Sequence, residues 1–183
     1  LGVNNRLQLS QAQKVLQQRI CERWMLDGVT LLDPDTTFID AQVELEQDTV
    51  VHPNTGIFGK TKVGRECRLG PNATITDYSI GDECQIESST LEEAKLEEKV
   101  HVGPYSHIRS GTHIEGDVHI GTSAEVKASH VGRGTRMGHF SYVGDATVGP
   151  KVNIGAGTVT CNYDGVSKHR TIIEEGALIG SDC

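Results

Sequence analysis

The chain has few aromatic residues, because Phe, Trp and Tyr make up only 4% of its 183 residues. This composition favours a thin core of stacked aliphatic side chains over a core built on large rings. Cationic residues are also in the minority, with 17 Lys and Arg against 25 Asp and Glu. The resulting net charge of −8 argues against nucleic acid or an anionic membrane as the main partner.

The sequence also lacks an apolar run of the roughly 20 residues that span a membrane, and no signal-like start is visible. Its five cysteines are odd in number and have no CxxC spacing, so we expect free thiols and a reducing, cytoplasmic location. Leu1 is not a usual first residue, and Cys183 ends the chain without a polar capping segment. We therefore expect both ends to lie inside a longer protein.

Glycine is abundant, with 21 residues, and it often follows an aliphatic residue. The aliphatic residues recur every five or six positions, a period that matches neither an α-helix nor an exposed strand. It is the hexapeptide signature of a parallel β-helix. The clearest stretch comprises Ile108, Ile114, Ile120, Val126, Val131, Met137, Val143, Val148 and Ile154.

Three hexapeptides make one triangular coil, so residues about 18 apart lie above one another at roughly 4.8 Å. The repeat can be followed from Ile57 to Val159 and resumes at Ile173. Residues 160–171 do not fit it and predict a loop that projects from a rigid scaffold, where function often lies. A tolerated surface insertion is the alternative.

The N-terminal part has a different pattern. We expect residues 1–9 to be irregular, and Ser10 with Gln13 resembles a capping box at the start of a helix. Apolar residues at helical spacing continue to Trp24, and Asp27-Gly28 is a stop signal, which predicts a helix over about 10–27. Residues 29–50 are mixed. We therefore divide the chain into a linker segment, 1–28, and a β-helix domain, 29–183, that is truncated at its C-terminus.

The stacking rule brings two cations together. If Ile108 and Val126 are equivalent inward positions, Arg109 and Lys127 share an outward column about 5 Å apart. Two cations at this distance repel by about 1 kcal/mol in water. A solvated basic stripe is one interpretation. The other is an anion site in which the guanidinium fork and the ammonium bind a phosphate.

The same arithmetic stacks Glu125 on Tyr142, places His139 beneath Ala156 and places Arg136 beneath Asn153. We therefore expect one corner of the prism to carry a candidate base, a carboxylate that orients it, a phosphate-binding pair and further polar donors, a plausible catalytic set. Its members are Arg109, Glu125, Lys127, His139, Tyr142 and Asn153, with Asn162 and Tyr163 in the loop above.

Four other histidines recur every six residues: His101, His107, His113 and His119. Six residues is one third of a coil, so consecutive members lie on different faces, and of these four only His101 and His119 share a column. A three-histidine zinc site within one chain does not follow. A site shared between neighbouring subunits stays open.

Three blocks of the sequence closely resemble one family. They are Gly2-Val3-Asn4-Asn5-Arg6-Leu7, the run Gly138 to Asp145, and the run Val152 to Gly165. Across essentially its whole length the chain resembles the bacterial bifunctional UDP-N-acetylglucosamine pyrophosphorylase/glucosamine-1-phosphate N-acetyltransferases. The resemblance implies a left-handed β-helix, joined through a helix to a preceding pyrophosphorylase domain, and a homotrimer with acetyltransferase sites between subunits.

The resemblance also implies residue roles. His139 matches the general base, and Arg109, Lys127, Tyr142 and Asn153 match positions that hold the sugar phosphate. Positions that contact acetyl-CoA are matched by Ala156, Asn162, Tyr163 and Ser181. Asn4 matches a residue that binds Mg²⁺ with the sugar nucleotide in the pyrophosphorylase half.

The expected reaction is acetyl transfer from acetyl-CoA to the amino group of glucosamine-1-phosphate, in the synthesis of UDP-N-acetylglucosamine for cell-wall precursors. The full-length enzyme would then uridylylate the product. His139 is suited to remove the proton from the acceptor ammonium, because an unperturbed histidine pKa is about 6.5. Glu125 is expected to select the histidine tautomer. The oxyanion donor is a backbone N–H, Asn162 or Tyr163.

Three other functions compete with this interpretation. The segment could be a trimerisation scaffold for a nucleotidyltransferase, without chemistry of its own, but a scaffold has no need for the grouped cations and histidine. An acyltransferase with another acceptor, such as a serine or an acyl-carrier protein, would share the hexapeptides. A β-helical carbonic anhydrase would need three histidines converging on zinc.

Overall fold

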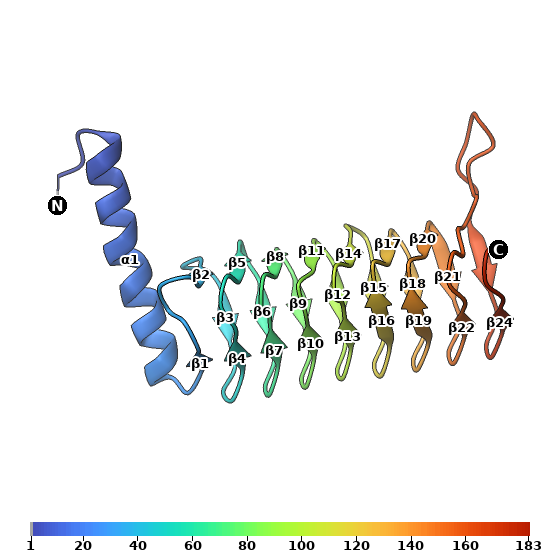
Figure 1. Ribbon diagram of the computed structural model, residues 1–183, viewed down its shortest axis with the longest axis horizontal. Helices are drawn as coiled ribbons and strands as arrows, with labels where there is room; N and C mark the ends of the chain where they lie inside the picture. The colour runs from blue at the N-terminus through green and yellow to red at the C-terminus, as the bar shows by residue number, and fades with distance from the viewer. Residues whose placement is uncertain (1) are drawn as a thin grey trace.

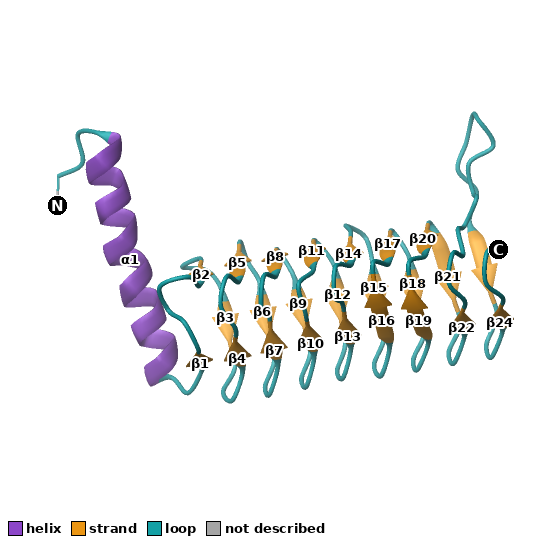
Figure 2. Cartoon of the chain, in the orientation of Figure 1, coloured by secondary structure: helices purple, strands orange, loops and turns teal. Residues whose placement is uncertain are grey.

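The computed structural model describes residues 2–183; residue 1, the first of the expected linker segment, lies outside the described residues. Within them the chain forms a helix, α1 (Arg6–Leu26), followed by 24 short strands. The strands wind into an elongated prism with α1 at one end and the C-terminus at the other (Figure 1). Turns join the strands at the corners (Figure 2).

The prism has three faces, each a parallel sheet within the described chain. Sheet A has nine strands: β1 (Thr30–Leu31), β4 (Val50–Val51), β7 (Arg68–Leu69), β10 (Gln85–Ile86), β13 (His101–Val102), β16 (His119–Thr122), β19 (Arg136–His139), β22 (Asn153–Ile154) and β24 (Leu178–Ile179). Sheet B has seven: β2 (Phe38–Ile39), β5 (Gly56–Phe58), β8 (Thr74–Thr76), β11 (Thr90–Glu92), β14 (His107–Ile108), β17 (Glu125–Lys127) and β20 (Tyr142–Gly144). Sheet C has eight: β3 (Glu44–Leu45), β6 (Lys62–Val63), β9 (Ser79–Ile80), β12 (Lys95–Leu96), β15 (His113–Ile114), β18 (His130–Val131), β21 (Ala146–Val148) and β23 (Thr171–Ile173).

The register confirms the parallel β-helix. Ile108 lies opposite Val126, and Val126 opposite Val143, so the aliphatic residue of each hexapeptide stacks on the equivalent residue of the next coil. These side chains fill the interior and are almost fully buried. Since burying one such side chain contributes about 1.5–3 kcal/mol, the ladder is the main source of stability.

The repeat fills the predicted β-helix domain from its first residues, although the sequence analysis could follow it only from Ile57. Residues 29–49 already form the first coil, with β1 to β3 in place and Leu31, Ile39 and Leu45 buried in the interior. The aliphatic positions were obscured by the longer connection between β1 and β2, which contains Pro34. The physical rule is unchanged, because one buried residue per short strand is enough to continue the stack.

The predicted start of the helix was wrong. Asn5, not Ser10, is the N-cap residue: its side chain accepts a hydrogen bond from the backbone N–H of Gln8 at 2.9 Å, and the helix begins at Arg6. An Asn side chain at this position satisfies one of the free N–H groups of the first turn. The predicted stop was right, because the helix ends at Leu26 and Gly28 adopts a left-handed φ of 94°.

Only the last turns of α1 pack on the prism, through Ile20, Cys21 and Trp24. The earlier apolar residues Val15 and Leu16 are exposed. No helix within residues 2–183 combines the length and the apolar character needed to cross a membrane.

The predicted excursion from the repeat is also present. After β22, residues 160–170 leave the prism as a long loop, and the chain returns as β23 (Figure 1). Tyr163 and Lys168 form an antiparallel bridge between the two legs of this loop. We call residues 160–170 the projecting loop.

Candidate functional site

Arg109 and Lys127 lie on the same edge of sheet B, as the stacking rule predicted. Arg109 directly follows β14 and Lys127 is the last residue of β17, whose Val126 is paired with Ile108. The backbone N–H of Arg109 donates to the carbonyl oxygen of Val126 at 2.8 Å, which keeps the two strands in register. Both cations therefore point outward from neighbouring coils.

The Arg109 side chain has a partner that the sequence analysis assigned elsewhere. Its Nη1 donates to Oε1 of Glu125 at 2.7 Å, and both side chains are partly exposed. This hydrogen bond raises the pKa of Arg109, so the guanidinium stays charged. The pair leaves other guanidinium N–H groups available for a second anion, because arginine carries five donors.

Glu125 was expected to orient His139. In the structure the hydrogen-bond partner of Glu125 is Arg109. Among residues 2–183 there is no hydrogen bond between Glu125 and the His139 ring. The expectation used vertical stacking alone, whereas the long arginine side chain reaches back along sheet B to the carboxylate. No contact within the described chain therefore supports the expectation that Glu125 orients His139.

A second lysine joins the cations, and the sequence analysis missed it. Lys168 of the projecting loop places its Nζ 3.8 Å from Oδ2 of Asp145, which follows β20. The neighbouring Lys168 ammonium lowers the pKa of Lys127. Lys127, Lys168 and Arg109 thus form a cluster of three cations, with Asp145 beside the two lysines. One feature of the sequence could have pointed to Lys168, because it lies in the segment that interrupts the hexapeptide repeat.

His139 is the last residue of β19 and is exposed at the corner between sheets A and B. Its backbone is fixed by Ser141, whose hydroxyl donates to the His139 carbonyl oxygen at 2.8 Å and is also 3.1 Å from the carbonyl of Gly155. Tyr142 begins β20 just after this corner and pairs in register with Glu125. The imidazole, the phenol and the Arg109–Glu125 pair therefore lie on adjoining edges of sheets A and B.

Asn153 does not join this corner within one chain, so its predicted place in the corner grouping was wrong, whereas its expected role in holding the sugar phosphate stays a prediction. It begins β22 and pairs with Arg136, at the opposite end of β19 from His139. Three residues of extended strand separate the two ends by about 10 Å. The sequence arithmetic had placed Asn153 correctly above Arg136, but it did not distinguish the two ends of a four-residue strand.

Ala156 and Ser181 continue the corner above His139. The backbone N–H of Gly157 donates to the carbonyl oxygen of Phe140 at 2.9 Å, and that of Asp182 donates to Ala156 at 2.8 Å. Successive coils therefore stack His139, Ala156 and Ser181 in one column, as predicted for the first two.

Asn162 and Tyr163 lie at the beginning of the projecting loop. Asn162 Nδ2 donates to Oδ2 of Asp145 at 3.1 Å and to the carbonyl oxygen of His169 at 3.0 Å. Tyr163 is 61% exposed, and its hydroxyl donates to Gly165 within the loop. The loop is held together at its tip by Asp164, which accepts bonds from Val166 and Ser167 and pairs with His169. These bonds lower the pKa of Asp164 to about 2.

Four of the other histidines form two pairs of contacting rings. His101 and His119 contact edge to face with ring centroids 4.7 Å apart, and His113 contacts His130 in the same way at 5.0 Å. The second pair was not recognised in the sequence. Among the described residues, no group of three or more His, Cys, Asp and Glu side chains is placed to hold a metal ion.

The Mg²⁺ implied by the resemblance does not fit this part of the chain alone. Asn4 is exposed before α1, and its backbone N–H donates to Gln8 Oε1 at 2.7 Å. One amide oxygen does not make a site for an ion that requires six oxygen ligands.

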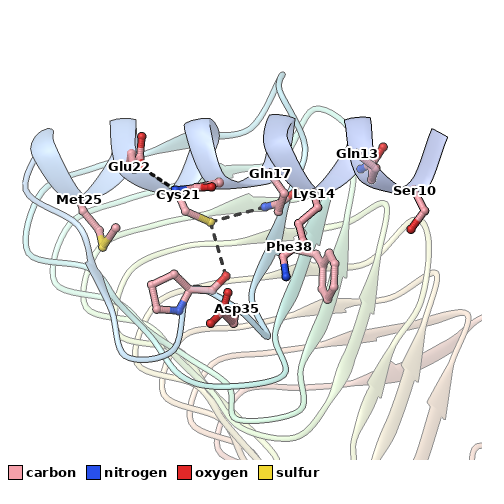
Figure 3. Close-up of a pocket in the computed structure, with 11 residues that line it drawn as sticks. Ser10, Gln13, Lys14, Gln17, Cys21, Glu22, Met25, Asp35 and Phe38 are labelled. Atoms are coloured by element: carbon pink, nitrogen blue, oxygen red, sulfur yellow. Dashed lines mark hydrogen bonds between the residues drawn. The ribbon is translucent and has the colours of Figure 1, made fainter. Parts of the chain in front are cut away.

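A separate groove runs between α1 and the first coil, with a volume of about 580 Å³ (Figure 3). Cys21 lies at its base, where the thiol is 3.9 Å from the carbonyl oxygen of Pro34 and accepts from Gln17 at 3.6 Å. Phe38 and Lys14 also line it. None of the residues predicted from the sequence to form the site lines this groove.

No protein-family model matches the sequence. Among curated proteins, the bifunctional protein GlmU of Carboxydothermus hydrogenoformans is 49% identical over 99% of this chain, which corresponds to 41% of that protein. GlmU of Geobacillus sp. is 46% identical over 98% of the chain and 39% of that protein. The chain thus spans about two fifths of the length of these relatives.

A solved structure also shares the fold. It is a histidine-to-alanine mutant of the GDP-perosamine N-acetyltransferase from Caulobacter crescentus in complex with CoA and GDP-perosamine, with a TM-score of 0.50 and 15% identity. The match covers 62% of this chain and 56% of the other. The family resemblance of the sequence motifs is therefore confirmed, and the chain is similar over nearly its whole length to one segment of the bifunctional GlmU proteins.

Proposed function

We propose that this chain transfers an acetyl group from acetyl-CoA to the amino group of glucosamine-1-phosphate. The observation that carries the proposal is the cluster of Arg109, Lys127 and Lys168 at the edge where the strands of sheet B end, with His139 exposed at the corner where sheet B begins. A cation cluster beside a free imidazole suits an acceptor that has both a phosphate and an amine that must lose a proton. The relatives named above support the same reaction.

The acceptor phosphate binds the cation cluster. The Arg109 fork supplies two parallel donors, and the two lysines act as point charges. Because Lys127 has a lowered pKa, it is the first of the three to lose its charge at high pH. A phosphate dianion opposes this by favouring the ammonium form. Binding of the phosphate fixes the position of the sugar ring and hence of its amino group, with Tyr142 at the neighbouring edge.

His139 acts as the general base. The acceptor amine is mostly an ammonium ion near neutral pH, and a neutral histidine imidazole is the side chain best suited to accept its proton there. The amine lone pair then attacks the thioester carbonyl carbon, the C–N bond forms and the C–S bond breaks. The leaving thiolate takes a proton from the His139 imidazolium, and the attacking nitrogen gives its second proton to the regenerated imidazole, so coenzyme A leaves as a thiol. A positioned base contributes about 10²–10⁴-fold, and proximity supplies much of the rest.

Acetyl-CoA lies along the corner column above His139. Ala156 and Ser181 follow His139 in successive coils, and Asn162 and Tyr163 lie in the projecting loop, which leaves the prism at the other edge of sheet B. This order places the thioester next to the imidazole. The oxyanion that develops during attack needs a hydrogen-bond donor, for which a backbone N–H of this corner and Asn162 are the candidates.

The active assembly is a homotrimer with its sites between subunits. The exposed corner of one chain carries His139, whereas Asn153 lies at the other end of sheet A. A neighbouring subunit that packs on sheet A can supply its own Asn153 to the sugar phosphate. This arrangement accounts for a role of Asn153 that a single chain does not provide.

In the longer protein, the product N-acetylglucosamine-1-phosphate is uridylylated to the UDP-sugar used for cell-wall precursors in the cytoplasm. Mg²⁺ serves that second reaction, and Asn4 supplies at most one of its ligands. The alternative, a trimerisation scaffold without chemistry, is less favoured because it leaves the cation cluster and the exposed His139 without a purpose.

The test is a steady-state assay of coenzyme A release in the full-length protein. Glucosamine-1-phosphate, glucosamine, glucosamine-6-phosphate and O-phosphoserine are compared as acceptors. We expect glucosamine-1-phosphate to have the highest kcat/KM of the four. Glucosamine, which lacks the phosphate, should have a much higher KM and a smaller change in kcat. Absence of turnover with every amine, in a protein that is trimeric by sedimentation, would leave the scaffold as the function.

A further inference from the structure

Asp145 lies at the point where the prism and the projecting loop meet. It follows β20 and adopts a left-handed φ of 50°, and its backbone N–H donates to the carbonyl oxygen of Lys127 at 3.0 Å. The residue is therefore fixed directly above a member of the cation cluster. Its carboxylate is half-buried rather than free in solvent.

Both legs of the loop are attached to this one residue. On the entering leg, Asn162 Nδ2 donates to Asp145 Oδ2 at 3.1 Å. On the returning leg, Lys168 Nζ lies 3.8 Å from the same oxygen, and the backbone N–H of Thr171 donates to the Asp145 carbonyl oxygen at 3.3 Å. The side chain of Asp145 thus contacts both legs of the loop, and its main chain also holds the returning leg.

The other contacts of the loop with the prism do not duplicate this function. Thr160 fixes the base of the entering leg, because its Oγ1 accepts from the backbone N–H of Gly144 at 2.9 Å. Arg170 Nε donates to Thr147 Oγ1 at 2.6 Å on the returning leg. Neither contact involves Asn162 or Lys168. Only the Asp145 carboxylate contacts both of these side chains within the described residues.

We propose that Asp145 is the positioning residue that couples the two halves of the site. It holds Asn162, assigned above to the acetyl donor, and Lys168, assigned to the acceptor phosphate, on one carboxylate next to Lys127. Loss of this carboxylate releases the loop and weakens both substrates together. The proposal rests on the proposed function for its kinetic part only, since anchoring of the loop is a property of the unliganded chain.

Charge gives the carboxylate a second role at the same place. Hydrogen bonding by Asn162 and the nearby charges of Lys127 and Lys168 lower the pKa of Asp145, so it is ionised at neutral pH. One negative charge between two ammonium groups reduces their mutual repulsion. The lysines can then approach each other closely enough to bind one phosphate. An uncharged residue at position 145 keeps the hydrogen bond at best and loses this compensation.

The experiment uses the full-length protein with three substitutions. Asp145→Ala removes both contacts, and Asp145→Asn keeps an acceptor oxygen for Asn162 but removes the charge. Asp48→Ala is the matched control, because Asp48 also has a positive φ of 63° at a corner of the prism, far from the loop. Amide hydrogen exchange of residues 162–169 is measured without substrates, together with thermal unfolding by circular dichroism.

For Asp145→Ala we expect exchange in residues 162–169 to accelerate at least tenfold and the KM values for acetyl-CoA and glucosamine-1-phosphate to rise together, each by roughly fivefold or more. For Asp145→Asn we expect the acceptor KM to rise more than the acetyl-CoA KM. Asp48→Ala should leave the exchange of the loop and both KM values unchanged.

Unchanged exchange of the loop in Asp145→Ala would overturn the proposal, whatever the kinetics. Faster exchange with a rise in only one KM would overturn the coupling of the two halves. If the wild-type protein itself transfers no acetyl group, the proposed function fails, while the exchange data still decide whether Asp145 anchors the loop.

Discussion

Arg109 Nη1 lies 2.7 Å from Glu125 Oε1, so the arginine of one coil is held by a carboxylate of the next. Both side chains are partly exposed, and the pair adds little to stability. The pair instead fixes the position of the guanidinium, which it holds against sheet B. Lys127 lies on the same sheet, at the end of its strand. A pre-oriented arginine loses less side-chain freedom when a phosphate binds.

Arg109→Ala should therefore affect binding of the acceptor more than the chemical step. Charge-assisted hydrogen bonds contribute about 1.5–3 kcal/mol, which corresponds to a rise of roughly tenfold or more in the KM for glucosamine-1-phosphate. The acetyl-CoA KM should change little. Arg68→Ala, which removes an exposed arginine from sheet A several coils away, is the control. An unchanged acceptor KM would rule out Arg109 as a phosphate ligand.

His139→Ala should lower kcat by about 10²–10⁴-fold and leave the acceptor KM nearly unchanged, because the base acts in the transition state and not in phosphate binding. The measurement is the pH profile of kcat, whose acidic limb should disappear in the variant. His52→Ala, in an early coil, serves as the control for loss of a histidine. A wild-type pH profile in His139→Ala would mean that another group is the base.

Gly121 and Gly138 form a matched pair for the packing of sheet A. A Cβ atom at Gly121 would lie 2.2 Å from the carbonyl oxygen of Gly138, whereas a Cβ at Gly138 would meet no atom within 4 Å. Backbone cannot move aside as a flexible side chain can, so Gly121→Ala should cost about 1–3 kcal/mol. Gly138→Ala should stay within about 0.5 kcal/mol. Chemical denaturation of both variants decides whether this stacking distance is critical.

Asn5→Ala tests the corrected start of the helix. Removing an N-cap side chain costs about 1 kcal/mol, and because the first turns of α1 are exposed, the loss should appear as local fraying rather than lower global stability. Hydrogen exchange of the Gln8 and Leu9 amides should accelerate in Asn5→Ala. Ser10→Ala should leave these amides unchanged. The opposite pattern would restore the capping box predicted from Ser10 and Gln13.

Acid should open the tip of the projecting loop. The folded-state pKa of Asp164 is about 2, below its usual value of 3.8, because Ser167, His169 and Val166 donate to the carboxylate. A depressed carboxyl pKa stabilises the folded loop above pH 4, and this contribution is lost as the pH falls toward 2. The amide resonances of Val166 and Ser167 should titrate with a midpoint near 2. A midpoint near 3.8 would mean that these hydrogen bonds do not persist in solution.

The fold could be predicted from the sequence because the period of a β-helix sets its register. Once Ile108 and Val126 are assigned to equivalent positions, the stacking of Arg109 on Lys127 and of Glu125 on Tyr142 follows from counting residues. The projecting loop could be recognised for the same reason, since it interrupts the count. The first coil lies within the predicted β-helix domain, but its aliphatic positions were not recognised because the longer β1–β2 connection hides the period.

The tertiary structure alone decided which groups touch. Long side chains leave their columns, so Glu125 contacts Arg109 and counting could not foresee it. The projecting loop returns to the prism through non-local contacts, which brought Lys168 and Asn162 to Asp145 without any periodic signal. For Asn153, counting residues predicted the correct coil, above Arg136, but it did not predict at which end of the strand the residue lies. Periodicity determines backbone stacking, whereas side-chain length and loop closure determine the site.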